Sequence, residues 1–317
     1  MSLTDLQAAA QPIGAAEEQI QGKTPWQLAW YRLRKDKAAI ISAIVILLII
    51  LSAIFAPLLS GWFGHPPTQT NTNTGLTADG LPLGPGAKHL LGTDELGRDI
   101  FSRAVYGGRI SLLVGLVSTL LATVFGVTIG VLAGFAGGWV DSVISRFLEI
   151  VLSFPYLIVA LVAAATIGPS MTMEIIVISF FSFAAMARIV RGQVISIKAK
   201  EYIEAARSLG AGPLRIMVID ILPNLLAPVI VIASLTIPTA IVFESTLTFL
   251  GAGVDIRIPS WGGMLSESTQ FYRFAPWYLF VPGGLLLLTT LAFNLLGDGV
   301  RDALDPGSER VFAKAGK

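Results

Sequence analysis

The chain has 317 residues, of which 54% are hydrophobic and only 14% are charged, and its formal net charge is +1. Soluble domains carry about 25% charged residues, so this composition excludes both an ordinary water-soluble protein and a disordered one. The small net charge gives no electrostatic basis for binding nucleic acid, and the absence of cysteine excludes disulfides and thiolate metal sites. The composition predicts an integral membrane protein.

Six segments are apolar over about 20 residues, the length that a helix needs to cross a bilayer. In chain order, these predicted spans cover residues 38–59, 110–134, 143–167, 172–195, 226–250 and 278–297. The first span is too long for the apolar part of a cleaved signal peptide, so we expect it to remain in the mature protein. The sequence therefore predicts an all-α protein with six transmembrane helices.

Lysine and arginine are unevenly distributed between the two sides of these spans. Six of the 22 fall on the side of segments 60–109 and 251–277, and the other 16 fall on the side of the termini. Because positive charge concentrates in cytoplasmic segments, both termini are predicted to be cytoplasmic. The predicted regions are a cytoplasmic tail (1–37), a first transmembrane helix (38–59), an extracytoplasmic loop (60–109), a five-helix core (110–300) and a second cytoplasmic tail (301–317).

The few charged residues inside the predicted spans do not suit an ion-coupled carrier. Glu149, Arg188 and Glu244 fall within spans. At a rise of 1.5 Å per residue, Glu149 lies roughly 9 Å from the inner end of its span, Arg188 about 24 Å from the outer end and Glu244 about 27 Å from the inner end, so none is central. Ion-driven carriers place acidic groups or histidines near the bilayer midplane, so a self-powered carrier is disfavoured.

The remaining polar residues do not suggest a catalytic site. Gly22–Lys23–Thr24 lacks the preceding glycine of a phosphate-binding loop, so no ATP-hydrolysing site is expected in this chain. The only histidines, His65 and His89, share the first outer loop, and metal ligation by them is the minor alternative. The charged stretch 94–99 lacks the spacing of an EF-hand. We expect it to pair locally and to cap a helix over 99–109 that runs into the second span, with contact to an external protein as the alternative.

The most informative segment is the main inward connection, residues 198–224. Residues 198–209 predict a helix, and one face of it is formed by Glu201, Glu204, Ala205 and Ser208. Gly210 is placed to end this helix in the left-handed conformation, and Pro213 suits the start of the next one. Pro223 is expected to interrupt the chain again before the fifth span. From the residues alone, an amphipathic connector at the membrane surface is an equally good interpretation.

Several motifs resemble one family of transport proteins. Glu204-Ala205-Ala206, followed by Gly210 and then Leu222-Pro223, resembles the EAA loop of ABC importer permeases, although Asp220 stands where that pattern usually has isoleucine. Three further stretches are similar to the C-type permease subunit of dipeptide and oligopeptide importers, which are binding-protein-dependent inner-membrane components. These are LGTDELGRD (91–99), LTFLGAG (247–253) and NLLGDGVRDALDP (294–306).

The resemblance implies a type I ABC importer permease fold in a bacterial inner (plasma) membrane. Such a subunit forms half of a translocation pore and performs no chemistry. The implied partners are a homologous B-type permease subunit, two ABC ATPase subunits, an extracytoplasmic substrate-binding protein and membrane lipid. ATP and Mg²⁺ would be bound by the ATPases, and no cofactor by this chain. The implied ATPase-docking residues are Glu201, Glu204, Ala205, Ala206, Ser208, Gly210, Leu222 and Pro223.

Two further sets of residues are assigned from the pattern of the spans. A four-residue glycine repeat, Gly126, Gly130, Gly134 and Gly138, is typical of close helix packing, either within the chain or against the partner permease. In the fifth span, Pro238, Glu244 and Ser245 are candidates to line the pore, because proline loosens a helix that borders a cavity. Lipid-facing or packing roles for Pro238 and Glu244 are the alternative.

Three alternatives for the function stay open at this point. The same architecture imports nickel, glycosides or haem in related permeases. A self-contained secondary carrier would transport alone with an ion gradient. A membrane enzyme or scaffold would show no dependence on an ATPase.

Overall fold

The computed structural model describes residues 25–255 and 257–305. Within these residues the chain is helical, and the only extended pairings are two isolated bridges, Leu76–Pro82 and Thr93–Asp99. The predicted tails 1–37 and 301–317 fall partly outside the described residues.

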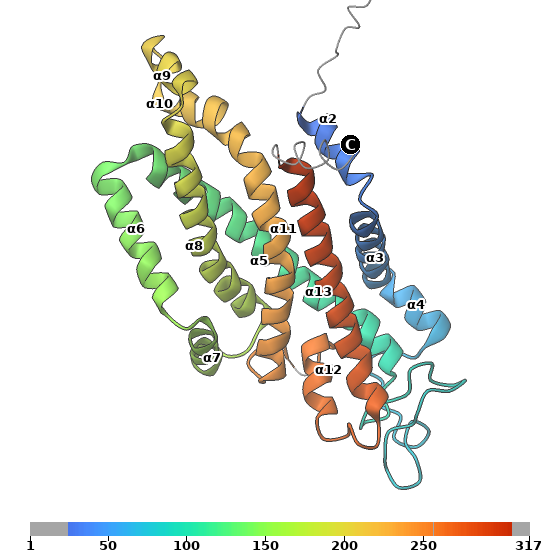
Figure 1. The fold of residues 1–317 in the computed structure, drawn as a ribbon. Helices are drawn as coiled ribbons and strands as arrows, with labels where there is room; N and C mark the ends of the chain where they lie inside the picture. The colour runs from blue at the N-terminus through green and yellow to red at the C-terminus, as the bar shows by residue number, and fades with distance from the viewer. Residues whose placement is uncertain (1–24, 256, 306–317) are drawn as a thin grey trace, which may run out of the picture.

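Figure 1 shows the described helices in chain order, coloured from blue to red. They are α2 (Pro25–Leu33), α3 (Lys37–Ile54), α4 (Ala56–Phe63), α5 (Ile100–Ala136), α6 (Gly138–Ser153), α7 (Tyr156–Ile167), α8 (Met171–Lys198), α9 (Glu201–Ser208), α10 (Pro213–Arg215), the π-helical segment η1 (Ile216–Ile221), α11 (Leu222–Phe249), α12 (Trp261–Ser268) and α13 (Pro276–Leu304).

Five of the described helical segments are long and apolar enough to cross a membrane: α3, α5, α8, α13 and the continuous stretch Pro213–Phe249 that ends in α11. The predicted single span 143–167 is wrong in its shape, because α6 and α7 meet at an angle of 79°. Pro155 has no amide hydrogen, and it forces the preceding Phe154 into extended backbone at φ −80° and ψ 134°. Together with this bent pair, the described residues contain up to six candidate crossings.

Proline also divides the first predicted span, 38–59. The helix α3 ends at Ile54, and α4 begins at Ala56 with Pro57 in its first turn. Pro57 cannot donate a hydrogen bond to the carbonyl of Ala53, so the helical ladder is interrupted there. The second span is longer than 110–134 because α5 begins at Ile100, and this matches the predicted helix over 99–109 that runs into the span.

The helices form a bundle with two distinct ends (Figure 1). The helix α5 crosses the bundle and packs against α8 and α11, and α13 packs between α11 and α3. Figure 1 shows α9, α2 and the C-terminal end of α13 at one end, with α12 and the loop between α4 and α5 at the other. The first and the last described helix, α2 and α13, thus meet at the same end of the bundle.

Candidate functional site

The end of the bundle that is predicted to be cytoplasmic carries the short helix α9. It covers less than the predicted 198–209, because α8 continues to Lys198 and α9 begins at Glu201. Ile203 is the one fully buried side chain of α9. It belongs to an apolar cluster that includes Val194 of α8, Ile216 of η1 and Leu225 of α11. A single side chain thus fastens α9 to both neighbouring spans.

The other face of α9 is open to its surroundings. The predicted docking residues Glu201, Glu204, Ala205 and Ser208 are exposed, and Ala206 is half-buried. Within the described residues, the Glu204 carboxylate forms no hydrogen bond or ion pair. Two large apolar side chains follow the helix, Leu209 with 88% and Leu214 with 74% of its surface exposed. The loop therefore presents free carboxylates beside exposed leucines.

Gly210 ends α9 as the sequence predicts. Its φ angle is +83°, and its N–H donates to the carbonyl of Arg207 at 2.9 Å. The N–H of Ala211 donates to the carbonyl of Ala206 at 3.0 Å, which completes a Schellman motif. Pro213 then begins α10, where its missing amide hydrogen leaves no bond unmade. The direction in which the chain leaves α9 is fixed by this turn.

The predicted interruption at Pro223 is wrong. The chain continues from α10 through η1 into α11, with Pro223 exposed in the first turn of α11 and Leu222 half-buried. Proline lacks the hydrogen that the helical ladder needs, and the π-helical segment η1 directly before it accommodates this loss. Asp220, at the position where the EAA pattern has isoleucine, is half-buried, and its carbonyl accepts a hydrogen bond from the Asn224 side chain at 2.7 Å.

Three of the four predicted packing glycines lie where α5 meets α8. A methyl group added at Gly126, Gly130 or Gly134 would lie 2.6 to 2.8 Å from atoms of α8. These distances leave no room for a side chain, so the two backbones approach closely. Gly138 does not continue the repeat, because α5 ends at Ala136 and Gly138 is an exposed residue with φ +54° at the start of α6. Its assignment to helix packing is wrong.

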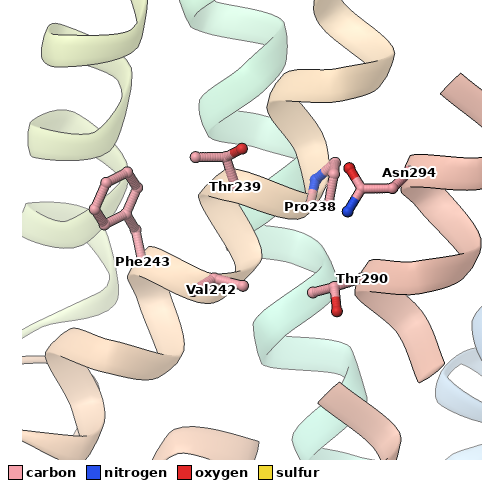
Figure 2. Close-up of a pocket in the computed structure, with 6 residues that line it drawn as sticks. All are labelled: Pro238, Thr239, Val242, Phe243, Thr290 and Asn294. Atoms are coloured by element: carbon pink, nitrogen blue, oxygen red, sulfur yellow. The ribbon is translucent and has the colours of Figure 1, made fainter. Parts of the chain in front are cut away.

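A groove of about 210 Å³ runs between α11 and α13 (Figure 2). It is lined by Pro238, Thr239, Val242, Phe243, Thr290 and Asn294. Figure 2 shows Pro238 of α11 and Asn294 of α13 opposite each other. Asn294 is exposed, and its amide has no partner within the described residues. Sequence reasoning missed Asn294, although an amide side chain inside an apolar span marks this position.

Of the three candidate pore residues, only Pro238 lines this groove. Glu244 and Ser245 are buried, and Ser245 donates a hydrogen bond to Glu244 at 3.1 Å. The Thr248 hydroxyl oxygen lies 3.3 Å from Glu244 Oε1 and 3.1 Å from Oε1 of Glu174, which comes from the first turn of α8. This buried polar cluster joins α8 to α11. Sequence reasoning missed Glu174, although an acidic residue three positions into a predicted span marks it.

At the opposite end of the bundle, the charged stretch 94–99 forms a buried network. The Arg98 Nε lies 2.6 Å from Asp94 Oδ2, and Arg103 pairs with the same carboxylate. Arg103 also pairs with Glu267 of α12, at a distance of 2.8 Å. Burial raises the pKa of the Glu95 carboxyl at the edge of this network. The predicted local pairing of Arg98 is confirmed, and the network ties the first loop to α5 and α12.

The amino-acid sequence of the chain matches a known family of membrane proteins. The family described as "Binding-protein-dependent transport system inner membrane component" matches residues 126–310, which is more than half of the chain. The chain belongs to this family. A second match, described as "N-terminal TM domain of oligopeptide transport permease C", covers residues 24–79. The chain is therefore an inner-membrane permease component with a transport role, and not an enzyme.

Individual relatives of this permease component cover nearly all of it. It is 44% identical over 290 residues to the dipeptide transport system permease protein DppC of Alkalihalophilus pseudofirmus, which covers 92% of each chain. It is also 44% identical over 288 residues to the oligopeptide transport system permease protein OppC of Escherichia coli, covering 91% of this chain and 93% of that protein.

A solved structure supports the fold of the permease component. An inward-facing conformation of the MetNI methionine ABC transporter aligns with a TM-score of 0.56, over 65% of this chain and 98% of that one. At 20% sequence identity, this likeness shows the fold alone. It is the fold of an ABC importer permease, as the sequence motifs implied.

Proposed function

We propose that this permease component is a subunit of an ATP-driven importer of dipeptides and oligopeptides. The observation that carries the proposal is the 44% identity to a dipeptide permease and to an oligopeptide permease along almost the full length of all three chains. A glutathione transport system permease of Shigella flexneri is 40% identical over 90% of this chain, and glutathione is itself a small peptide. These relatives favour peptides over the nickel, glycosides or haem of other permeases.

The proposed partners are a homologous B-type permease subunit, two cytoplasmic ATPases and an external substrate-binding protein. In this assembly, α9 docks on an ATPase through its exposed face, where Glu204 offers a carboxylate without an intrachain partner. The small Ala205 allows close approach, and the exposed Leu209 adds apolar contact area.

The proposed coupling works through the anchoring of α9. Because Ile203 packs in one cluster with residues of α8, η1 and α11, a displacement of α9 by the ATPase moves these spans with it. The Schellman turn at Gly210 fixes the direction of the chain beyond α9, so this motion is not absorbed by a loose loop. The chain itself needs no ATP site in this mechanism.

We further propose that the groove between α11 and α13 faces the translocation path, and not lipid. An unpaired amide is costly in hydrocarbon, and Asn294 is exposed with its amide unpaired. Because the chain has no cysteine, single cysteines at Asn294 and Thr239 can be labelled with a water-soluble reagent. Labelling that changes between nucleotide-free and ATP-bound transporter supports the assignment, and no labelling in either state contradicts it.

The experiment that tests the function combines purification with uptake. The chain is purified from the membranes of its own organism, and we expect two ATPases, a second permease and a binding protein to accompany it. Uptake of a labelled dipeptide and of a labelled tetrapeptide is then measured in cells with and without the gene. Loss of peptide uptake supports the proposal, whereas unchanged peptide uptake with loss of nickel, glycoside or haem uptake contradicts it.

A further inference from the structure

The loop between α4 and α5 brings together both histidines of the chain. His65 follows the end of α4, His89 lies ten residues before Asp99, and Asp99 caps the N-terminus of α5. Asp99 Oδ2 lies 2.8 Å from Nδ1 of His89 and 3.7 Å from Nδ1 of His65. The two imidazole rings lie with their centroids 4.7 Å apart. Three segments that are separate in sequence thus direct two nitrogens and one oxygen at one point.

Apart from the hydrogen bond between His89 Nδ1 and Asp99 Oδ2 at 2.8 Å, the groups of this cluster are free to accept a cation. Asp99 is completely buried, and it caps α5 with Oδ1 only, by accepting the N–H of Ser102 at 2.9 Å. Oδ2 is therefore left to the histidines. His65 Nδ1 is buried but has no hydrogen-bond partner, since 3.7 Å is too long for a bond to the carboxylate. An unpaired buried nitrogen beside a buried carboxylate is an unfavourable arrangement that a bound cation relieves.

A second acidic cluster in the same region differs from this one because arginines pair with it. Asp94, Glu95 and Glu267 also lie close enough together for a shared ion, but arginines neutralise them. Among the ion pairs formed by the described residues, none brings a lysine or arginine to Asp99. The His65–His89–Asp99 cluster has ligand atoms within 4.8 Å of one another and no protein cation of its own.

We propose that His65, His89 and Asp99 form a binding site for a divalent transition-metal ion of the zinc type. Two imidazoles and one carboxylate are ligands that such ions prefer. Bonds of about 2.0–2.2 Å in tetrahedral geometry place neighbouring ligand atoms about 3.3–3.6 Å apart, and the separations of 2.8 and 3.7 Å lie on either side of that range. Metal binding through Nδ1 requires the proton of the His89 ring to move from Nδ1 to Nε2, so that both histidines bind as neutral imidazoles.

The proposed site is open to its surroundings on one side, and a bound ion would link two helices. The His65 side chain is 41% exposed, which leaves an entry path and a fourth position for water. The ion joins the end of α4 to the start of α5, where the Ser60 hydroxyl already donates to the His65 carbonyl at 2.9 Å. The metal thus stabilises the loop on the face of the permease that is predicted to be external.

Zinc binding by the purified full-length chain tests this proposal. The chain is prepared without a histidine tag, stripped with a chelator, incubated with Zn²⁺ and desalted, and its metal content is measured. We expect one zinc per chain and a higher melting temperature with zinc. His65→Ala and Asp99→Asn should each reduce zinc affinity by at least about tenfold.

Two features of the variants keep the test decisive. Asn is as good a helix cap as Asp, so Asp99→Asn keeps the start of α5, and His65 is exposed enough to be replaced without a core cavity. Asp79→Asn removes the same charge from an exposed position in the same loop and should bind zinc as the unaltered chain does. The absence of zinc from the unaltered chain overturns the proposal, as does equal zinc binding by folded His65→Ala and Asp99→Asn.

Discussion

The anchoring of α9 by Ile203 gives a quantitative prediction. Replacing Ile203 by alanine removes three carbon atoms from a fully buried site. At about 0.8 kcal/mol per methylene the lost burial is about 2.4 kcal/mol, and the remaining cavity brings the cost into the range of about 2–5 kcal/mol. A cost near 3 kcal/mol increases the population in which α9 is detached by roughly 150-fold, since about 1.4 kcal/mol is a factor of ten.

Hydrogen exchange of the chain in lipid nanodiscs measures this population directly. Peptides that cover residues 201–211 should lose protection by about two orders of magnitude in Ile203→Ala, because local opening controls their exchange. Ile203→Val should show an effect of about 1 kcal/mol, or roughly fivefold. Leu209→Ala, at an exposed position beside the same helix, should leave protection unchanged. Equal protection in Ile203→Ala and the unaltered chain would refute the anchoring role.

Three further predictions concern the packing of α5 against α8, the turn after α9 and the outer ion-pair network. Gly130→Leu should lower the melting temperature through overpacking of about 1–3 kcal/mol against α8, whereas Gly192→Leu, which faces open space, should not; equal melting temperatures would contradict the close approach. Gly210→Ala should cost about 1–2 kcal/mol at its left-handed φ and lower the protection of the Ala211 amide, whereas the same protection in both chains would speak against the turn. Arg103→Gln removes one of the two arginines that neutralise the buried Asp94 and Glu267, and it should cost up to about 3–5 kcal/mol in thermal unfolding; a melting temperature near that of the unaltered chain would argue against the outer network.

The sequence was sufficient to predict five of the six proposed spans and the turn at the end of α9. Hydropathy identifies apolar segments of the right length, and glycine or proline at a helix end has a direct local meaning, as Gly210 and Pro213 show. The same reasoning failed at Pro155 and Pro223. Both prolines break the hydrogen-bond ladder, but one produces a bend of 79° and the other a π-helical segment within a continuous helix. The helices that pack around each proline decide between these outcomes, and the arrangement of those helices is not evident from a single sequence.

The candidate sites show the same limit. The residues on the exposed face of α9 could be predicted from helical spacing, because they all lie on one short helix. Glu174 and Glu244 are 70 positions apart, and only the packing of α8 against α11 brings them to the same Thr248 hydroxyl. Gly138 continued the four-residue repeat in sequence but lies beyond the end of α5. Spacing predicts contacts within an element, whereas contacts between elements require the fold.

The central claim is that ATP hydrolysis drives transport through the exposed face of α9. The most direct test reverses the charge of Glu204 in the assembled transporter and measures ATP hydrolysis and peptide uptake in the same vesicles. Asp302→Lys is the matched control, because Asp302 is also an exposed acidic residue and lies in the last turn of α13. Glu204→Lys should insert into the membrane normally and lose peptide uptake while ATP hydrolysis continues. Normal peptide uptake by Glu204→Lys would contradict the claim.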